Sequence, residues 1–127
     1  MLIRNGFVTN PDFLDAFNGL MKREMPIWQC LEMSKSVEEI LKQISIVDRA
    51  KLAIADQYGK KENGQLVILE KNVVFDDDNK KNICLAKVQE LLEETFEISL
   101  TSKVKVPKNE IFTPYKFALL QDVIEIV

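Results

Sequence analysis

The sequence predicts an α+β fold: a helical N-terminal half with one long amphipathic helix packed on a small, mainly antiparallel sheet, and two further helices. Three observations support this class. Apolar residues recur at helical spacing between Ser36 and Tyr58. Residues 66–75 and 95–106 are rich in β-branched and aromatic side chains, and the second segment alternates apolar with polar residues. Residues 80–94 and 114–123 again show helical periodicity.

The length and composition of the chain favour one domain. With 127 residues, of which 46% are hydrophobic, the chain can bury its own core but is too short for two ordinary domains. We therefore expect a single domain over residues 1–127. Within it, residues 1–35 would form an N-terminal arm with short helices, and residues 36–127 the α+β core.

The first residues, Leu2–Thr9, suit either a short edge strand or an extended arm. Asn10 then starts a helix, because Asn caps helices and the following Pro11 fits the first helical position. Pro26 is expected to end this helix after Met25, because proline cannot continue a helix. A second short helical segment would lead from there into the long helix.

This N-terminal region is unusually rich in aromatic and methionine side chains. One interpretation is that they lie on the long helix as core. The other is a soft, partly exposed apolar surface for a partner, since thioether side chains adapt to irregular surfaces and large apolar patches mark interaction sites. The candidates for such a surface are Phe13, Phe17, Met21, Met25 and Trp28.

The long helix is predicted over residues 36–58. Ser36 would cap its N-terminus, and Gly59 would end it in the left-handed conformation. The residues expected on its buried face are Val37, Ile40, Leu41, Ile44, Val47, Ile54 and Tyr58.

A turn and an acidic cluster follow the long helix. Asn63 and Gly64 predict a turn, and the apolar runs 66–69 and 73–75 could form one bent strand or a hairpin. The cluster 76–79 does not match a calcium loop, because Lys residues occupy its fifth and sixth positions. Asp78 or Asn79 is instead expected to cap a helix over 80–94, with Cys84, Val88, Leu91 and Leu92 facing inward.

Residues 95–106 predict either a strand pair or one long bent strand, with a break at Ser102. Thr113 and Pro114 then start a final helix that extends to Val123. The apolar C-terminal residues 123–127 would dock in this subunit or in a neighbouring one, because their exposure would lower solubility.

The composition argues against several kinds of function. The chain has no histidine and only four, well separated glycines, so it lacks both the usual catalytic base and a phosphate-binding glycine loop. A net charge of −3 without a basic stripe argues against nucleic-acid binding. We expect a non-enzymatic cytoplasmic protein with no cofactor, metal or membrane span, whose two cysteines, Cys30 and Cys84, are buried thiols.

Several local sequences resemble those of a known family. They are the Tyr58–Gly59 pair, the Lys-Lys-Glu-Asn-Gly-Gln turn at 60–65, the Leu-Leu-Glu-Glu-Thr-Phe-Glu-Ile sequence at 91–98 and the Ala-Leu-Leu sequence at 118–120. With these features the chain resembles the small non-virion tail-assembly proteins of siphophages of Gram-positive bacteria, and is most similar to the lactococcal tape measure protein chaperones. The resemblance covers residues 36–127 and leaves the aromatic N-terminal third unaccounted for.

The resemblance implies a late protein of the host cytoplasm that is missing from the mature virion. It would bind amphipathic helical segments of the tape measure protein and keep them soluble until the tail tube forms. A repeated client of this kind suits open head-to-tail oligomers of the chaperone. Two alternatives are a structural tail or connector subunit, and a phage-encoded inhibitor of a host protein.

Overall fold

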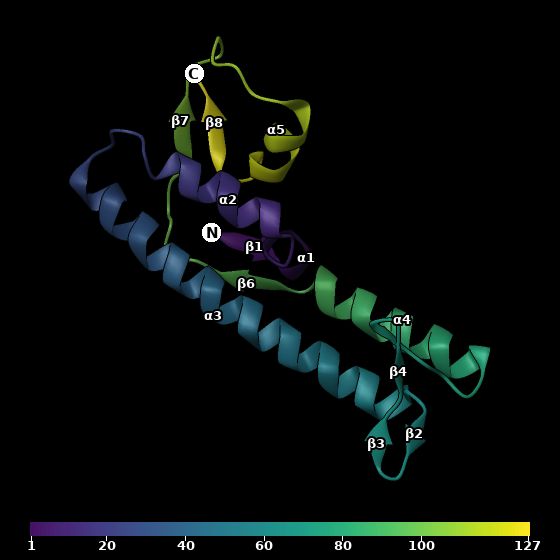
Figure 1. Ribbon diagram of the computed structural model, residues 1–127. Helices are drawn as coiled ribbons and strands as arrows, with labels where there is room; N and C mark the ends of the chain where they lie inside the picture. Colours follow the sequence, from purple (N-terminus) through teal and green to yellow (C-terminus); the bar gives the residue numbers. More distant parts are fainter.

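Helix α3 (Ile27–Tyr58) is the longest element, and the other elements are arranged along it (Figure 1). This computed structural model describes residues 1–127. The α+β class is confirmed, because five helices are combined with four pairs of short strands. The other helices are α1 (Asn5–Val8), α2 (Pro11–Leu20), α4 (Asp78–Glu93) and α5 (Pro114–Leu120). The strands are β1 (Leu2–Arg4), β2 (Lys61–Glu62), β3 (Gln65–Leu66), β4 (Ile68–Leu69), β5 (Asn72–Val73), β6 (Thr95–Glu97), β7 (Val104–Val106) and β8 (Ile124–Ile126).

Helix α3 begins earlier than the sequence predicts. Pro26 is its N-cap residue with extended backbone (φ −54°, ψ 146°), and helical structure continues from Ile27 without a break through Ser36. No Gly or Pro interrupts residues 27–58, so the separate short segment expected after Pro26 is the first part of this helix. The prediction of Ser36 as a cap was therefore wrong. Helix α2 likewise ends at Leu20, before the predicted Met25.

Gly59 ends α3, but its conformation differs from the prediction. Its φ of −71° and ψ of 156° are extended rather than left-handed. Glycine is needed there for space: a Cβ at this position would lie 2.7 Å from the Ala55 carbonyl oxygen and 2.3 Å from the Leu66 Cδ1. The close approach brings the β2–β3 and β4–β5 hairpins directly against the end of α3.

Four polar side chains on one side of α3 hydrogen-bond in turn to residues 99–102. We call them the α3 ladder: Gln29, Glu32, Ser36 and Glu39. Ser36 Oγ accepts a bond from the Leu100 N–H over 2.9 Å, and both residues are fully buried. These bonds supply partners for the backbone of a segment that is not itself in a strand. The segment between β6 and β7 is thereby attached along α3.

Helix α4 runs back beside the C-terminal half of α3 (Figure 1). It starts at Asp78, and its N-cap is Asp77, whose side chain accepts a bond from the Lys80 N–H over 2.8 Å. The predicted caps, Asp78 and Asn79, were thus one or two residues late. Asp77 serves better because its extended backbone leaves its carboxylate free to reach the third residue of the helix.

Asn5 joins α1, α3 and α4 although it is buried. Its Nδ2 donates to the Leu91 carbonyl over 2.9 Å, and its Oδ1 accepts from Gln43 Nε2 over 3.0 Å. Its backbone N–H donates to the Glu94 carbonyl over 2.9 Å. A buried amide with these partners is satisfied and holds the C-terminal end of α4 beside the middle of α3.

The strands form four separate two-stranded sheets, three antiparallel and one parallel, instead of one small sheet. β6 and β7 were predicted to pair with each other or to form one bent strand. They pair instead with strands from opposite ends of the chain, β6 with β1 and β7 with β8. The first residues are therefore a strand, the first of the two predicted alternatives for that segment.

Two adjacent hairpins connect α3 to α4. The predicted turn at Asn63 and Gly64 is confirmed, with φ of 52° and 76° between β2 and β3. Glu70 and Lys71 form the second turn, also with positive φ, although neither residue favours it. Residues 66–75 therefore contribute a hairpin, β4–β5, rather than one bent strand.

The main core lies around the N-terminal half of α3. Its buried cluster has sixteen residues, seven of which come from residues 1–35 (Ile3, Val8, Phe13, Ala16, Phe17, Leu20 and Met33). These first residues are thus integral to the core rather than an arm beside it. The C-terminal residues dock within the subunit in part: Val123 and Ile124 are buried, while Ile126 and Val127 remain exposed.

Candidate functional site

The five aromatic and methionine residues predicted as a partner surface do not form one surface. Phe13 and Phe17 are only 1% and 0% exposed, and their rings stack at a centroid distance of 6.0 Å. The assignment of these two residues as accessible was wrong, because the apolar face of α2 packs into the core. Met21 and Trp28 are 39% and 48% exposed, and Met25 is partly buried against the core.

Met25 and Trp28 instead line a groove of about 590 Å³ beside β7. We call it the Trp28 groove; its walls are residues 23–26, 28 and 29 on one side and residues 102–105 on the other. Six of its ten lining residues are polar or charged, so it differs from the apolar surface that the sequence predicted. Met21 does not take part in it.

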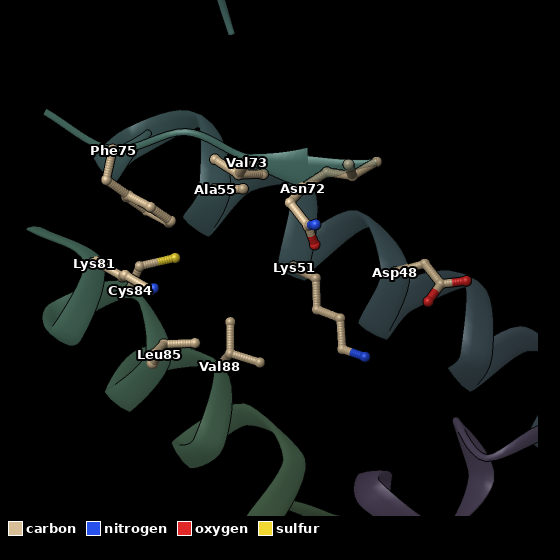
Figure 2. Close-up of a pocket in the computed structure, with 11 residues that line it drawn as sticks. Asp48, Lys51, Ala55, Asn72, Val73, Phe75, Lys81, Cys84, Leu85 and Val88 are labelled. Carbon is tan, nitrogen blue, oxygen red and sulfur yellow. The ribbon is translucent and has the colours of Figure 1, made fainter. Parts of the chain in front are cut away.

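A larger hollow lies between the C-terminal half of α3 and the N-terminal half of α4. This α3–α4 cleft has a volume of about 820 Å³ and is mainly apolar. Figure 2 shows side chains from α3, from α4, from β5 and from Phe75 after it surrounding one open space. Its apolar lining residues are Leu52, Ala55, Val73, Phe75, Cys84, Leu85 and Val88.

The cleft stays open because the fold holds α3 and α4 at both ends. The Asn5 hydrogen bonds fix one end, and the two hairpins that follow Gly59 fix the other. Between these points the helices do not fill the space with their own side chains. Leu52 is 66% exposed and Leu85 is 56% exposed, although both line the cleft.

Comparison of this chain with protein-family models, with curated proteins and with solved structures finds no match.

Three charged residues also line the cleft. Asp48 and Lys51 extend from α3, and Lys81 from the first turn of α4 (Figure 2). The only sulfur group in the cleft is the Cys84 thiol, whose pKa is raised by burial, so the thiol is neutral near pH 7. A neutral thiol without a base beside it is a poor nucleophile. The chemistry that the cleft offers is therefore mainly apolar contact, to which its charged lining residues add ion pairing.

The acidic cluster before α4 serves the helix itself. Asp77 caps α4, and Asp76 forms an ion pair with Lys80 at 3.5 Å. No group of three or more Cys, Asp or Glu side chains lies in an arrangement that could hold a metal ion. None of the helices is both long and apolar enough to span a membrane.

Sequence reasoning missed Leu52 and Leu85 because both lie off the apolar stripes used to define the inner faces of their helices. The stripe on α3 also included Leu41, which is in fact half exposed. The signal that could have found the cleft was an excess of leucine beside the stripe on two helices that a short double hairpin joins. Two such helices usually lie next to each other, so leucines beside the stripes of both can line one space between them.

Proposed function

We propose that this protein is a phage tail-assembly chaperone that holds amphipathic helical segments of the tape measure protein in the α3–α4 cleft. The observation that carries the proposal is the open apolar cleft between two antiparallel helices. The identity of the client is inferred from the resemblance of residues 36–127 to non-virion tail-assembly proteins. The chaperone would act in the host cytoplasm and keep the client soluble until the tail tube forms.

The geometry of the cleft suits a helix as its occupant. Two packed helices leave a groove along their contact, and a third helix can place an apolar stripe into it at the usual interaxial distance of about 8–10 Å. Leu52 and Leu85 come from opposite walls, so an inserted stripe would contact both. Burying the exposed part of each leucine would contribute about 1–2 kcal/mol.

The mixed chemistry of the cleft also suits a client of varied sequence. Its apolar lining includes Phe75, Val88 and the small side chain of Ala55, which make contacts without directional demands. The flexible Lys51 and Lys81 side chains, which also line the cleft, can pair with acids on the polar face of a bound helix. A site of this kind selects amphipathic character more than a particular sequence.

Coexpression with helical fragments of the tape measure protein from the same phage tests this proposal. Leu52→Glu places a carboxylate where the client's apolar stripe would lie, and we expect it to lower the soluble yield of the fragment about tenfold or more. Leu41→Glu is the matched control, because Leu41 is a half-exposed leucine of the same helix that does not line the cleft. Equal loss of client solubility in both variants, or in neither, would contradict the proposal.

Two further measurements separate this function from its alternatives. Immunoblotting of purified virions should not detect the protein, whereas a structural tail or connector subunit would remain in the particle. Affinity purification from infected cells should recover the tape measure protein, and an inhibitor would recover a host protein instead. Separately, analytical ultracentrifugation with and without client would show how many copies associate with one client molecule; open head-to-tail association predicts a number that rises with client length.

A further inference from the structure

The Trp28 groove lies on a different part of the molecule from the α3–α4 cleft and has different chemistry. One of its walls is the loop between α2 and α3 with the first turn of α3, which contributes Met25 and Trp28. The other wall is β7 with Ser102 and Lys103 before it. Gln29 Nε2 donates to the Ser102 carbonyl over 3.3 Å and joins the two walls at one end of the groove.

The wall formed by β7 is an open strand edge. β7 has a single neighbour, β8, in a two-stranded parallel sheet. The Val104 N–H donates to the Val123 carbonyl over 2.9 Å, and the Val106 carbonyl accepts from the Val127 N–H over 3.0 Å. Because peptide groups alternate in direction along a strand, the N–H and C=O of Lys105 face away from β8. They are free to pair with another strand.

The charges at the groove are mainly positive. Lys103 and Lys105 line it, and neither forms an ion pair within the chain. Arg23, a third cationic lining residue, is already paired with Glu110, and Glu24 is the one carboxylate in the lining. The whole chain carries a net charge of −3, so the two unpaired lysines make this edge positively charged on a protein that is negatively charged overall. They complement an acidic partner.

We propose that the Trp28 groove binds an extended acidic segment of a partner protein, which adds a strand to the open edge of β7. The backbone of that segment would pair with Lys105, as in other cases of β-strand addition. Acidic side chains at alternate positions would lie near Lys103 and Lys105, and an apolar side chain would contact Trp28 and Met25. The Trp28 groove is separate from the α3–α4 cleft, so the protein could hold two partners at once.

Lys103 and Lys105 also disfavour the pairing of β7 with a second copy of itself. A second copy of β7 would place like charges opposite each other, which destabilises a strand pair. Lysine on an edge strand is a common protection against such self-pairing. An acidic strand meets no such barrier, because each lysine then faces a carboxylate. Charge complementarity therefore selects a partner that differs in sequence from β7 itself.

The test uses the full-length protein and a rhodamine-labelled hexapeptide in which Glu and Val alternate. Binding is followed by the anisotropy of the dye and, with unlabelled peptide, by the emission of Trp28, the only tryptophan in the chain. We expect saturable binding that weakens with added salt. The variant Lys103→Glu with Lys105→Glu should bind about tenfold more weakly, because the charge reversal removes two exposed ion pairs and places two like charges opposite the peptide.

Three controls make the test specific. Lys42→Glu with Lys87→Glu changes the net charge by the same amount on exposed parts of α3 and α4 outside the groove, and should leave binding unchanged. The hexapeptide in which Lys and Val alternate should bind the Lys103→Glu, Lys105→Glu variant better than the original protein. The cleft variant Leu52→Glu should bind the acidic peptide normally, which separates this inference from the proposed function.

Four outcomes would overturn the inference. The first is equal binding of the acidic peptide to both double variants. The second is undiminished binding of an acidic peptide that is N-methylated at alternate residues, because strand addition needs those N–H groups. The third is binding of a short oligothymidylate in place of the peptide, which would mark a nucleic-acid surface. The fourth is a change in Trp28 emission that depends on protein concentration alone, which would mark a second copy as the occupant.

Discussion

Replacing Ser36 with Ala tests whether the α3 ladder holds residues 99–102 on the long helix. The Ser36 hydroxyl is fully buried and accepts a 2.9 Å bond from the equally buried Leu100 N–H. The substitution removes the acceptor and leaves the N–H without a partner, which costs about 1–3 kcal/mol. Alanine is the better helix former by up to about 0.5 kcal/mol, so we expect a net destabilisation of about 1–2 kcal/mol.

Urea unfolding followed by circular dichroism measures this difference. For a chain of this length the expected loss corresponds to a fall in Tm of roughly 3–8 °C. Ser34→Ala is the matched control, because Ser34 is an exposed residue of the same helix without a side-chain hydrogen bond. It should leave stability unchanged or raise it slightly. If Ser36→Ala were as stable as Ser34→Ala, the ladder would not hold this segment and the placement of residues 99–102 would be wrong.

Three further predictions concern the end of α3, the core and the cleft. Gly59→Ala should destabilise the fold by about 1–3 kcal/mol in urea unfolding, because its Cβ would lie 2.7 Å from a carbonyl oxygen in the last turn of α3. Phe17→Ala should cost about 3–5 kcal/mol, whereas Met21→Ala should change stability by less than about 1 kcal/mol; equal effects would show that Phe17 is not buried. Because burial raises the pKa of the Cys84 thiol, iodoacetamide should modify Cys84 more slowly than the partly exposed Cys30 at about pH 8, as measured by peptide mass spectrometry. The folded state keeps the Cys84 proton to higher pH than the unfolded state. The stability that comes from this proton is therefore present below the unfolded-state pKa and is lost as the pH rises through the folded-state pKa. A Cys84→Ala variant that showed the same loss of stability would contradict the assignment to Cys84.

Features that depend on neighbouring residues were predictable from the sequence. Asn10 and Thr113 cap their helices as expected, since each is followed by a proline at the first helical position. The turn at Asn63 and Gly64 was predictable for the same kind of reason, because both residues tolerate positive φ.

Features that depend on distant residues were not predictable. β6 and β7 have alternating patterns that reveal strands but not their partners, and the actual partners lie at the two ends of the chain. Ser36 has the local pattern of a helix cap, yet its hydroxyl is used by Leu100, sixty-four residues later. A single sequence contains no local signal for either contact.

The same limit applies to the candidate site. Phe17 and Trp28 are both large and apolar, and only tertiary packing decides that Phe17 on α2 is buried while Trp28 at the start of α3 is half exposed. Leu52 and Leu85 were assigned to no surface, because the apolar stripes that predict the inner faces of α3 and α4 are continuous without these two residues. The cleft that they line arises from the angle and spacing of α3 and α4, which the Asn5 hydrogen bonds and the close contact at Gly59 determine.

Site-specific photocrosslinking would locate the bound client on the surface of the protein. A benzoylphenylalanine residue would be placed at Leu85 in the cleft, and in separate proteins at Leu41 and at Trp28, before coexpression with the tape measure protein. We expect crosslinks to helical segments of the tape measure protein from position 85 and not from position 41 or 28. Crosslinks from position 28 or 41 with none from position 85 would show that the α3–α4 cleft is not where the client binds.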